Sequence, residues 1–116
     1  MTSVQDIPVA QYISLAVGSG CLACALDGIP GTPAEWHHPR AEVGMSERAP
    51  DEDGIALCPS HHRGVGMPAV AHEGHCSVHL HPVSFHKSYG DDEHLTKLQR
   101  IIVQKILNNS IGMVRV

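Results

Sequence analysis

The sequence predicts a small α+β domain that depends on bound metal for its stability. The chain has 116 residues, enough for one domain, but only one Trp, one Phe and two Tyr to build a core. It contains ten His and four Cys instead. Segments with helical spacing at both ends flank a middle region of short apolar runs and turns. Because the binding free energy of a structural zinc ion contributes to folding, metal is the simplest replacement for the missing apolar core.

The first element expected is an N-terminal helix within residues 1–19. Ser3 can cap it, Pro8 suits an early turn, and the apolar residues that follow recur on one side. The stretch Gly18-Ser19-Gly20 ends it. We interpret this helix as scaffold.

A Cys-x-x-Cys motif, Cys21 and Cys24, follows directly. Between glycines the motif is typical of a zinc knuckle, although redox proteins use it too. A redox motif needs a strand before it and a helix that begins within it. Here a helix is expected before the motif and a turn-rich segment, residues 27–33, after it, so we favour metal binding.

The stretch 55–63, Ile-Ala-Leu-Cys-Pro-Ser-His-His-Arg, is the predicted centre of the domain. Its apolar run indicates a buried strand, and its Pro suits the first turn of a helix. On that turn Cys58 and His61 lie close enough to bind one metal ion, whereas His62 is rotated by about 100° and points elsewhere. A closed structural zinc site is therefore predicted, with the ligands Cys21, Cys24, Cys58 and His61.

Two adjacent imidazoles, His37 and His38, lie in a short predicted strand. Side chains alternate in a strand, so one can bind metal while the other faces substrate or water. The alternative is a pair of surface histidines. We expect His37, His62 and a later His to form an open three-nitrogen site, with His38 left to take a proton from water. The candidates for the later ligand are four histidines and one cysteine, namely His72, His75, Cys76, His79 and His81.

Two further segments complete the chain. Residues 42–54 are expected to form a polar loop between strands, in which Asp51 and Asp53 are candidates for orienting a catalytic His. Residues 91–109 predict a C-terminal helix, because acids lead and apolar residues follow at helical spacing. We interpret that helix as scaffold.

Charge limits the partners. The net charge of −4 with neutral His opposes metal-free binding to bulk duplex DNA, because Lys and Arg on phosphates supply that affinity. Arg40 and Arg63 are nonetheless candidate phosphate contacts. The start of the chain does not resemble a secretion signal and no run is long enough to span a membrane, so we expect a cytosolic protein with reduced thiols.

Together these motifs resemble HNH (ββα-metal) endonucleases, and most closely the phage recombination-enhancement nucleases, the Ref-like group. The resemblance covers about residues 20–90. It is carried by Gly20-Cys21-Leu22-Ala23-Cys24, Thr32-Pro33-Ala34-Glu35-Trp36-His37-His38, Leu57-Cys58-Pro59-Ser60-His61-His62-Arg63-Gly64, Gly64-Val65-Gly66 and Phe85-x3-Tyr89-Gly90.

The resemblance implies one HNH-like domain over residues 1–116, with a β-hairpin, a short helix over the metal and a zinc knuckle. It makes His37 and His62 ligands of a catalytic ion, Mg²⁺ or another divalent cation, and His38 the general base. Asp53 is the candidate for the role that an Asn usually has in the family. The Ref-like pattern puts its last His six residues before the Phe, a distance that matches His79, with residues 67–78 as an insertion.

The resemblance also implies cleavage of DNA phosphodiester bonds in phage or mobile-element recombination, with a RecA-type recombinase filament as partner. The alternative is a zinc-stabilised nucleic-acid or protein binding module, or an inhibitor, on a nuclease-like scaffold without cleavage. The second set of histidines distinguishes the two, because a binding module does not need His37 and His38 beside His62.

Overall fold

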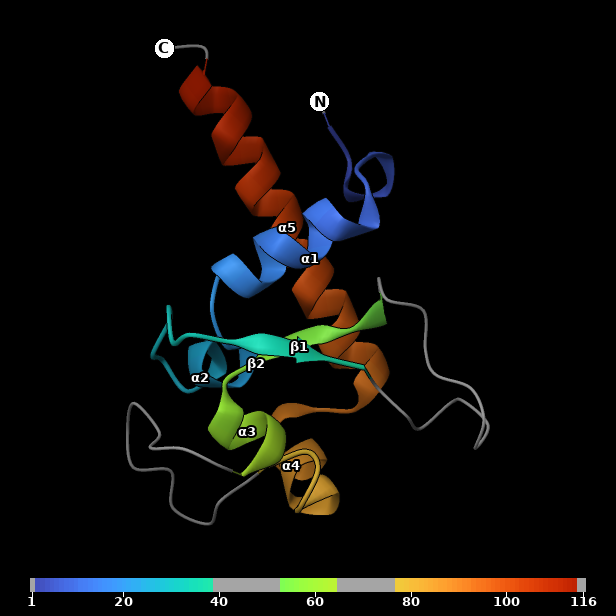
Figure 1. Ribbon diagram of the computed structural model, residues 1–116, viewed down its shortest axis with the longest axis vertical. Helices are drawn as coiled ribbons and strands as arrows, with labels where there is room; N and C mark the ends of the chain where they lie inside the picture. The colour runs from blue at the N-terminus through green and yellow to red at the C-terminus, as the bar shows by residue number, and fades with distance from the viewer. Residues whose placement is uncertain (1, 39–52, 65–76, 115–116) are drawn as a thin grey trace.

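The protein is a small α+β chain in which helices surround one short hairpin (Figure 1). The computed structural model describes residues 2–38, 53–64 and 77–114. The elements in order are a 3₁₀ helix η1 (Val4–Asp6), α1 (Val9–Gly18), α2 (Leu22–Leu26), β1 (Glu35–His37), β2 (Ile55–Leu57), α3 (Pro59–Arg63), α4 (Pro82–Tyr89) and α5 (Asp92–Val114).

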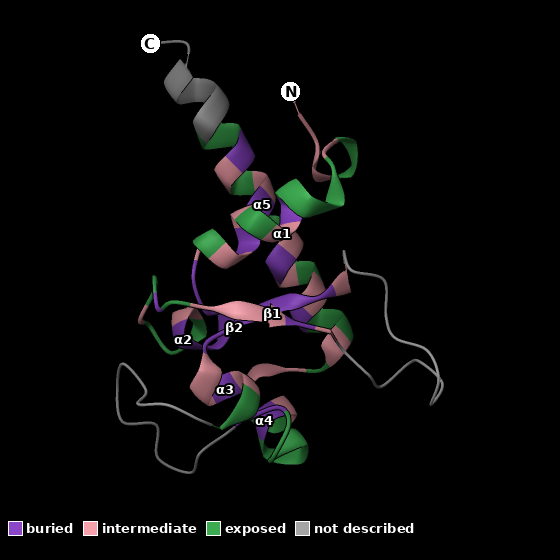
Figure 2. Ribbon diagram, viewed as in Figure 1, coloured by how far each residue is buried: buried purple, intermediate pink, exposed green. Residues whose placement is uncertain are grey.

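Strands β1 and β2 pair antiparallel, with Glu35 opposite Leu57 and His37 opposite Ile55. All three residues of β2 are buried, and Figure 2 shows this strand at the centre of the chain. The outer edge of β2 is covered by α5, because the backbone N–H of Ala56 donates to Oε1 of the buried Gln99 at 2.9 Å. The sheet therefore has little unpaired edge at this point.

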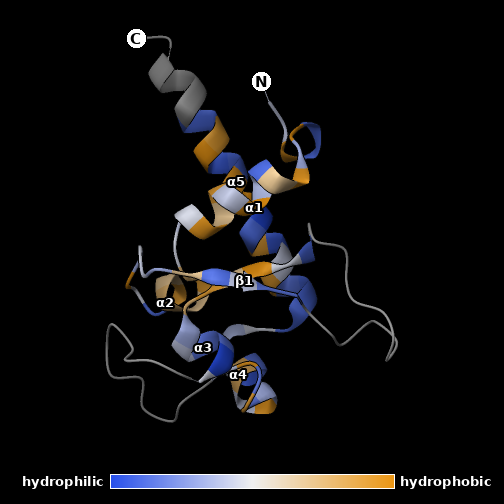
Figure 3. Cartoon of the chain, viewed as in Figure 1, coloured by the Kyte–Doolittle hydropathy of each residue, from blue (hydrophilic) through white to orange (hydrophobic). Residues whose placement is uncertain are grey.

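Two apolar clusters make up the core. One surrounds the Cys-rich segments and includes Phe85 and Leu95, and the other joins α1 to α5 through Tyr12, Ala16 and Val103. Hydrophobic residues are concentrated on α2 and β2, whereas α3 is hydrophilic (Figure 3). Helix α5 contributes to both clusters and so connects the Cys-rich part of the chain to the N-terminal helix.

The N-terminal segment differs from the single expected helix. Ser3 caps η1 by accepting from the N–H of Gln5 at 3.3 Å, and α1 begins only after Pro8. Ile7 between them is extended, with φ −104° and ψ 153°. A residue before proline is disfavoured in the α conformation, so the helix cannot run through this point. The C-terminal helix, by contrast, extends beyond its predicted end, to Val114.

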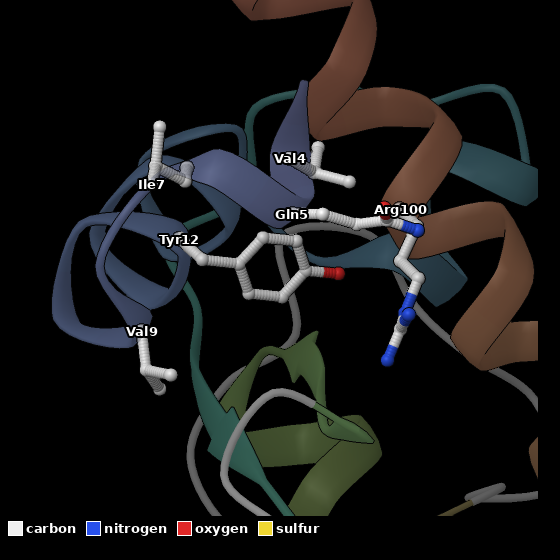
Figure 4. A pocket seen from close by; sticks show the side chains of 6 residues that line it. All are labelled: Val4, Gln5, Ile7, Val9, Tyr12 and Arg100. Atoms are coloured by element: carbon white, nitrogen blue, oxygen red, sulfur yellow. The ribbon is translucent and has the colours of Figure 1, made fainter. Parts of the chain in front are cut away.

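A hollow of about 280 Å³ lies between the N-terminal segment and α5 (Figure 4). Within it the ring of Tyr12 points toward Arg100, and burial raises the pKa of the Tyr12 hydroxyl to about 12. Its lining residues are Val4, Gln5, Ile7, Val9, Tyr12 and Arg100, none of which is a Cys or His. Among the described residues, no helix combines the length and apolar character needed to cross a membrane.

Candidate metal centres

The first candidate centre is a buried cluster of three cysteines and one histidine. Its ligand atoms belong to Cys21, Cys24, Cys58 and His61, and all lie within 4.8 Å of one another. None of the four residues is more than 3% exposed. The four residues that the sequence singles out as one set are thus brought together from two segments of the chain.

The two contributing segments have the same local structure. Cys21 is the N-cap of α2 and its Sγ accepts from the N–H of Cys24 at 3.4 Å. Cys58 is the N-cap of α3 and its Sγ accepts from the N–H of His61 at 3.5 Å. In each segment the cap and the third helical residue both direct a donor atom to one side. The spacing of two intervening residues is therefore a property of the helix start.

The distances between donor atoms fit a tetrahedral zinc ion. Zn–S bonds of about 2.3 Å and Zn–N bonds of about 2.0–2.1 Å place two sulfurs about 3.8 Å apart and a sulfur and a nitrogen about 3.6 Å apart. The sulfurs of Cys24 and Cys58 are 3.9 Å apart. Nδ1 of His61 lies 3.5, 3.5 and 3.3 Å from the sulfurs of Cys21, Cys24 and Cys58. A metal ion such as zinc can therefore bind here.

The thiols also require a cation to ionise together. A hydrogen bond from the Cys21 thiol, then His61, lowers the pKa of Cys58 to about 3, whereas the same hydrogen bond raises the pKa of Cys21. Burial raises the pKa of Cys24. Three sulfurs in one buried space thus share their protons, and a divalent ion is the group that allows all three to become thiolates.

One argument against a redox role does not hold. A helix does begin within the Cys-x-x-Cys motif, because α2 starts at Leu22. The turn-rich segment begins where it was expected, at Asp27, the C-cap of α2. Metal binding is instead favoured by the convergence of Cys58 and His61 on the same point, which a two-cysteine redox motif does not need.

The second candidate centre is a cluster of three imidazoles. His37, His62 and His79 have ligand atoms within 4.8 Å of one another. The ring centres are 5.0 Å apart for His37 and His62, 5.5 Å for His37 and His79, and 4.6 Å for His62 and His79. His37 is buried and His79 is exposed, so the cluster is open to solvent on one side.

The hairpin places His37 at the last position of β1. The chain packs closely there: a Cβ added to Gly54 would lie 2.5 Å from the carbonyl oxygen of His37 and from the Trp36 ring. The sheet therefore requires glycine at residue 54, and this close packing fixes the backbone of His37 against the start of β2.

The segment that contains His79 is attached to helix α3 through its backbone. The N–H of Val78 donates to the carbonyl of His61 at 2.8 Å, and the N–H of His79 donates to that of His62 at 3.2 Å. The last carbonyls of a helix have no partner within it, so α3 offers them to this segment. His79 is thereby placed beside His62, although residues 65–76 between them lie outside the described part of the chain.

A carboxylate orients His62. Nδ1 of His62 lies 2.9 Å from Oε1 of Glu35, while Arg63 donates to Oε1 and Oε2 of the same carboxylate at 2.6 and 3.1 Å. Arg63, and to a lesser extent His62, lowers the pKa of Glu35 below its ordinary value. The ionised carboxylate accepts a hydrogen bond from the Nδ1–H of His62, so Nε2 of His62 is the nitrogen available to bind metal.

Helix α3 thus directs two adjacent imidazoles to different clusters. Successive residues of a helix are rotated by about 100°. His61 turns inward, 1% exposed, toward the three sulfurs, while the side chain of His62 is 12% exposed and faces His37 and His79.

Two residues with predicted roles have other partners. Asp53 pairs with Arg100 of α5 at 2.5 Å, and its carbonyl accepts from Thr96. Asp53 does not belong to the three-histidine cluster, and its catalytic role stays a prediction. Arg63, expected on phosphate, is paired with Glu35, because the two side chains meet across β1 and α3.

The remaining predicted residues divide into two groups. His38 follows His37 at the end of β1 and is half-buried, and His81 is the exposed N-cap of α4. Neither belongs to the three-histidine cluster. The predictions for Arg40, Asp51, His72, His75 and Cys76 lie outside the described residues.

Glu35 is a residue whose role the sequence analysis missed. It lies two positions before His37 in β1, and residues two apart in a strand share a face. That alternation is the signal that could have identified it as a neighbour of the metal site. Its contacts to Arg63 and His62 span 28 and 27 residues, and local patterns do not reveal such contacts.

Comparison with known proteins adds no relative. No protein-family model, no curated protein and no solved structure matches this chain. The resemblance to HNH endonucleases therefore depends on the sequence motifs.

Proposed function

We propose that this protein is a metal-dependent DNA endonuclease of the HNH type. The observation that carries the proposal is the cluster of His37, His62 and His79 on a strand–strand–helix unit, with His38 directly after His37 and a separate Cys₃His cluster beside it. A structural zinc site alone would need only the Cys₃His cluster.

The donor atoms fit a divalent ion that keeps open positions. His37, His62 and His79 would hold it, and the exposed side at His79 leaves space for further ligands. Such an ion, when bound, stabilises negative charge on a phosphate and on the leaving oxygen. Three imidazoles suit zinc, cobalt or nickel better than Mg²⁺ or Mn²⁺, which prefer oxygen ligands, and the assay below compares them.

The proposed general base is His38. Side chains alternate along a strand, so the imidazole after His37 does not point to the same place as the His37 ring. His38 takes the proton of the attacking water as the water oxygen bonds to phosphorus and the bond to the leaving oxygen breaks. Glu35 contributes by holding His62 in the Nδ1–H form.

DNA as substrate is proposed from the resemblance, as are the role in phage or mobile-element recombination and the RecA-type filament. The charge of the chain bears on this point. The net charge is −4, and Arg63 and Arg100 are both in ion pairs, so we expect these two arginines to contribute little to phosphate binding. We expect DNA affinity to depend on bound metal or on a partner filament.

The same charges favour one alternative, a zinc-stabilised binding module without cleavage. In that case the three histidines hold no catalytic ion, and their replacement changes neither DNA binding nor zinc content. A single cleavage assay distinguishes the endonuclease from the binding module.

The assay is cleavage of supercoiled plasmid by the zinc-loaded protein, with Mn²⁺, Ni²⁺, Co²⁺, Zn²⁺ or Mg²⁺ added in turn. We expect nicking with wild type and loss of nicking with His79→Ala. His81→Ala is the matched control, because this neighbouring imidazole lies outside the cluster. Nicking that survives His79→Ala, or no nicking by wild type with any ion, would overturn the proposal.

A further inference from the structure

The second nitrogen of His61 has a partner in a different part of the chain. Nε2 of His61 lies 3.1 Å from the hydroxyl of Tyr89, and this hydroxyl donates to Oδ2 of Asp27 at 2.7 Å. Tyr89 is the last residue of α4 and Asp27 is the C-cap of α2. The contacts therefore join three helices at the Cys₃His cluster.

The protons along these contacts can be assigned from the chemistry. Nδ1 of His61 faces the three sulfurs, so it has no proton when it binds a metal. A neutral imidazole then has its proton on Nε2 and donates it to the Tyr89 oxygen. The Tyr89 hydroxyl accepts that bond and donates its own proton to the Asp27 carboxylate, an acceptor when ionised.

Packing fixes the phenol ring in this position. The ring of Tyr89 lies edge-on to that of His61, with centres 5.4 Å apart, and 5.0 Å from the ring of Phe85. Phe85 is fully buried, one helical turn before Tyr89. The hydroxyl is therefore presented to His61 by a partly buried ring that packs on the core, whereas Asp27, at 36% side-chain exposure, lies at the surface.

We propose that Tyr89 and Asp27 are positioning residues for the Cys₃His metal site. They hold His61 in the Nε2–H form, direct Nδ1 at the metal and make the imidazole a stronger ligand. The proposal rests on metal binding by the Cys₃His cluster and goes beyond the endonuclease proposal, because it does not depend on DNA cleavage. Partners of this kind change metal affinity by about 10–100-fold.

The test is zinc affinity, measured by competition with a chromophoric chelator. Tyr89→Phe removes the hydroxyl and keeps the ring on Phe85, so we expect zinc affinity to fall by about 10–100-fold. Asp27→Ala should lower it less, because the carboxylate acts through Tyr89. The chain has two Tyr, and Tyr12→Phe is the matched control, since Tyr12 lies in the other core cluster and should leave zinc affinity unchanged.

A second readout separates positioning from general packing. In ¹⁵N NMR of the zinc-loaded protein, His61 should show a protonated Nε2 whose proton exchanges slowly, and Tyr89→Phe should speed that exchange. If Tyr89→Phe does not fold, Asp27→Ala at the surface provides the same two measurements. A Tyr89→Phe protein whose zinc affinity stays within about twofold of wild type would overturn the proposal, and so would a proton on Nδ1 of His61 in the zinc-loaded wild type.

Discussion

The two clusters meet on helix α3 but differ in donors and in exposure. The Cys₃His cluster supplies four donors, three of them sulfur, and its residues are at most 3% exposed. The three-histidine cluster supplies three nitrogens and has an exposed member, His79. The first leaves no coordination position open on a tetrahedral ion, and the second leaves at least one.

The difference also extends to the surroundings of two neighbouring histidines. His61 directs Nδ1 to the sulfurs of its cluster, and its Nε2 is hydrogen-bonded to Tyr89. In His62 it is Nδ1 that is hydrogen-bonded, to Glu35. One helical step therefore separates an imidazole of the closed cluster from one of the open cluster. Changes at the first cluster should remove the folded state, and changes at the second should remove activity from an intact fold.

The largest effect is expected from Cys58→Ser. Structural zinc in small domains contributes about 10–16 kcal/mol of apparent free energy, as much as the whole stability of a typical domain. The variant should lose its zinc, which elemental analysis measures, and its cooperative thermal transition, which circular dichroism measures. Cys76→Ser, which changes the one cysteine outside the set, should retain both. A folded Cys58→Ser protein that retains its zinc would contradict the structural role.

His38→Ala should separate catalysis from metal binding. Loss of a general base lowers the rate by about 10²–10⁴-fold. Because His38 is not in the three-histidine cluster, metal affinity and melting temperature should stay near wild type. Single-turnover cleavage, metal titration and a melting curve on the same sample test this. Cleavage at the wild-type rate would remove His38 from the mechanism.

Glu35→Gln should weaken the open cluster and spare the closed one. The amide is a poorer acceptor for Nδ1 of His62, so we expect metal affinity at the three-histidine cluster to fall by about 10–100-fold. Titration with Mn²⁺ or Co²⁺ of the zinc-loaded protein measures this. Arg63→Ala, which removes the other partner of Glu35, is the control and should have a smaller effect. Equal losses in both variants would mean that Glu35 acts through charge alone.

The smallest effect is expected from Asp53→Asn. Its ion pair with Arg100 is partly exposed on both sides, at 41% and 38%, and exposed pairs contribute about 0–1 kcal/mol. Cleavage should be unchanged and the free energy of unfolding slightly lower in urea titrations. A large loss of cleavage with unchanged stability would support the catalytic role predicted from the sequence.

Local geometry explains which parts of the structure could be predicted. The spacing of Cys21 and Cys24, and of Cys58 and His61, reflects the start of a helix, so the four-donor set follows from short patterns. The position of His37 beside His62 required the hairpin register as well. His79 could be predicted as the third histidine only from the resemblance, in which the last His stands six residues before the Phe.

The hydrogen bonds and ion pairs of side chains outside the two clusters could not be predicted. Asp53 pairs with a residue 47 positions away, and Tyr89 with one 62 positions away. Nothing in the sequence near Asp53 distinguishes a carboxylate that orients a histidine from one that binds an arginine of α5. The break at Ile7, by contrast, was readable, because the residue before Pro8 resists the helical conformation.

The most direct test of the central claim, that α3 contributes to two separate metal sites, is native mass spectrometry at increasing Zn²⁺. Wild type should bind one zinc tightly and a second more weakly. His62→Ala should bind only the first, with an unchanged circular dichroism spectrum. A wild type that saturates with one zinc, or an His62→Ala protein that still binds two, would contradict this account.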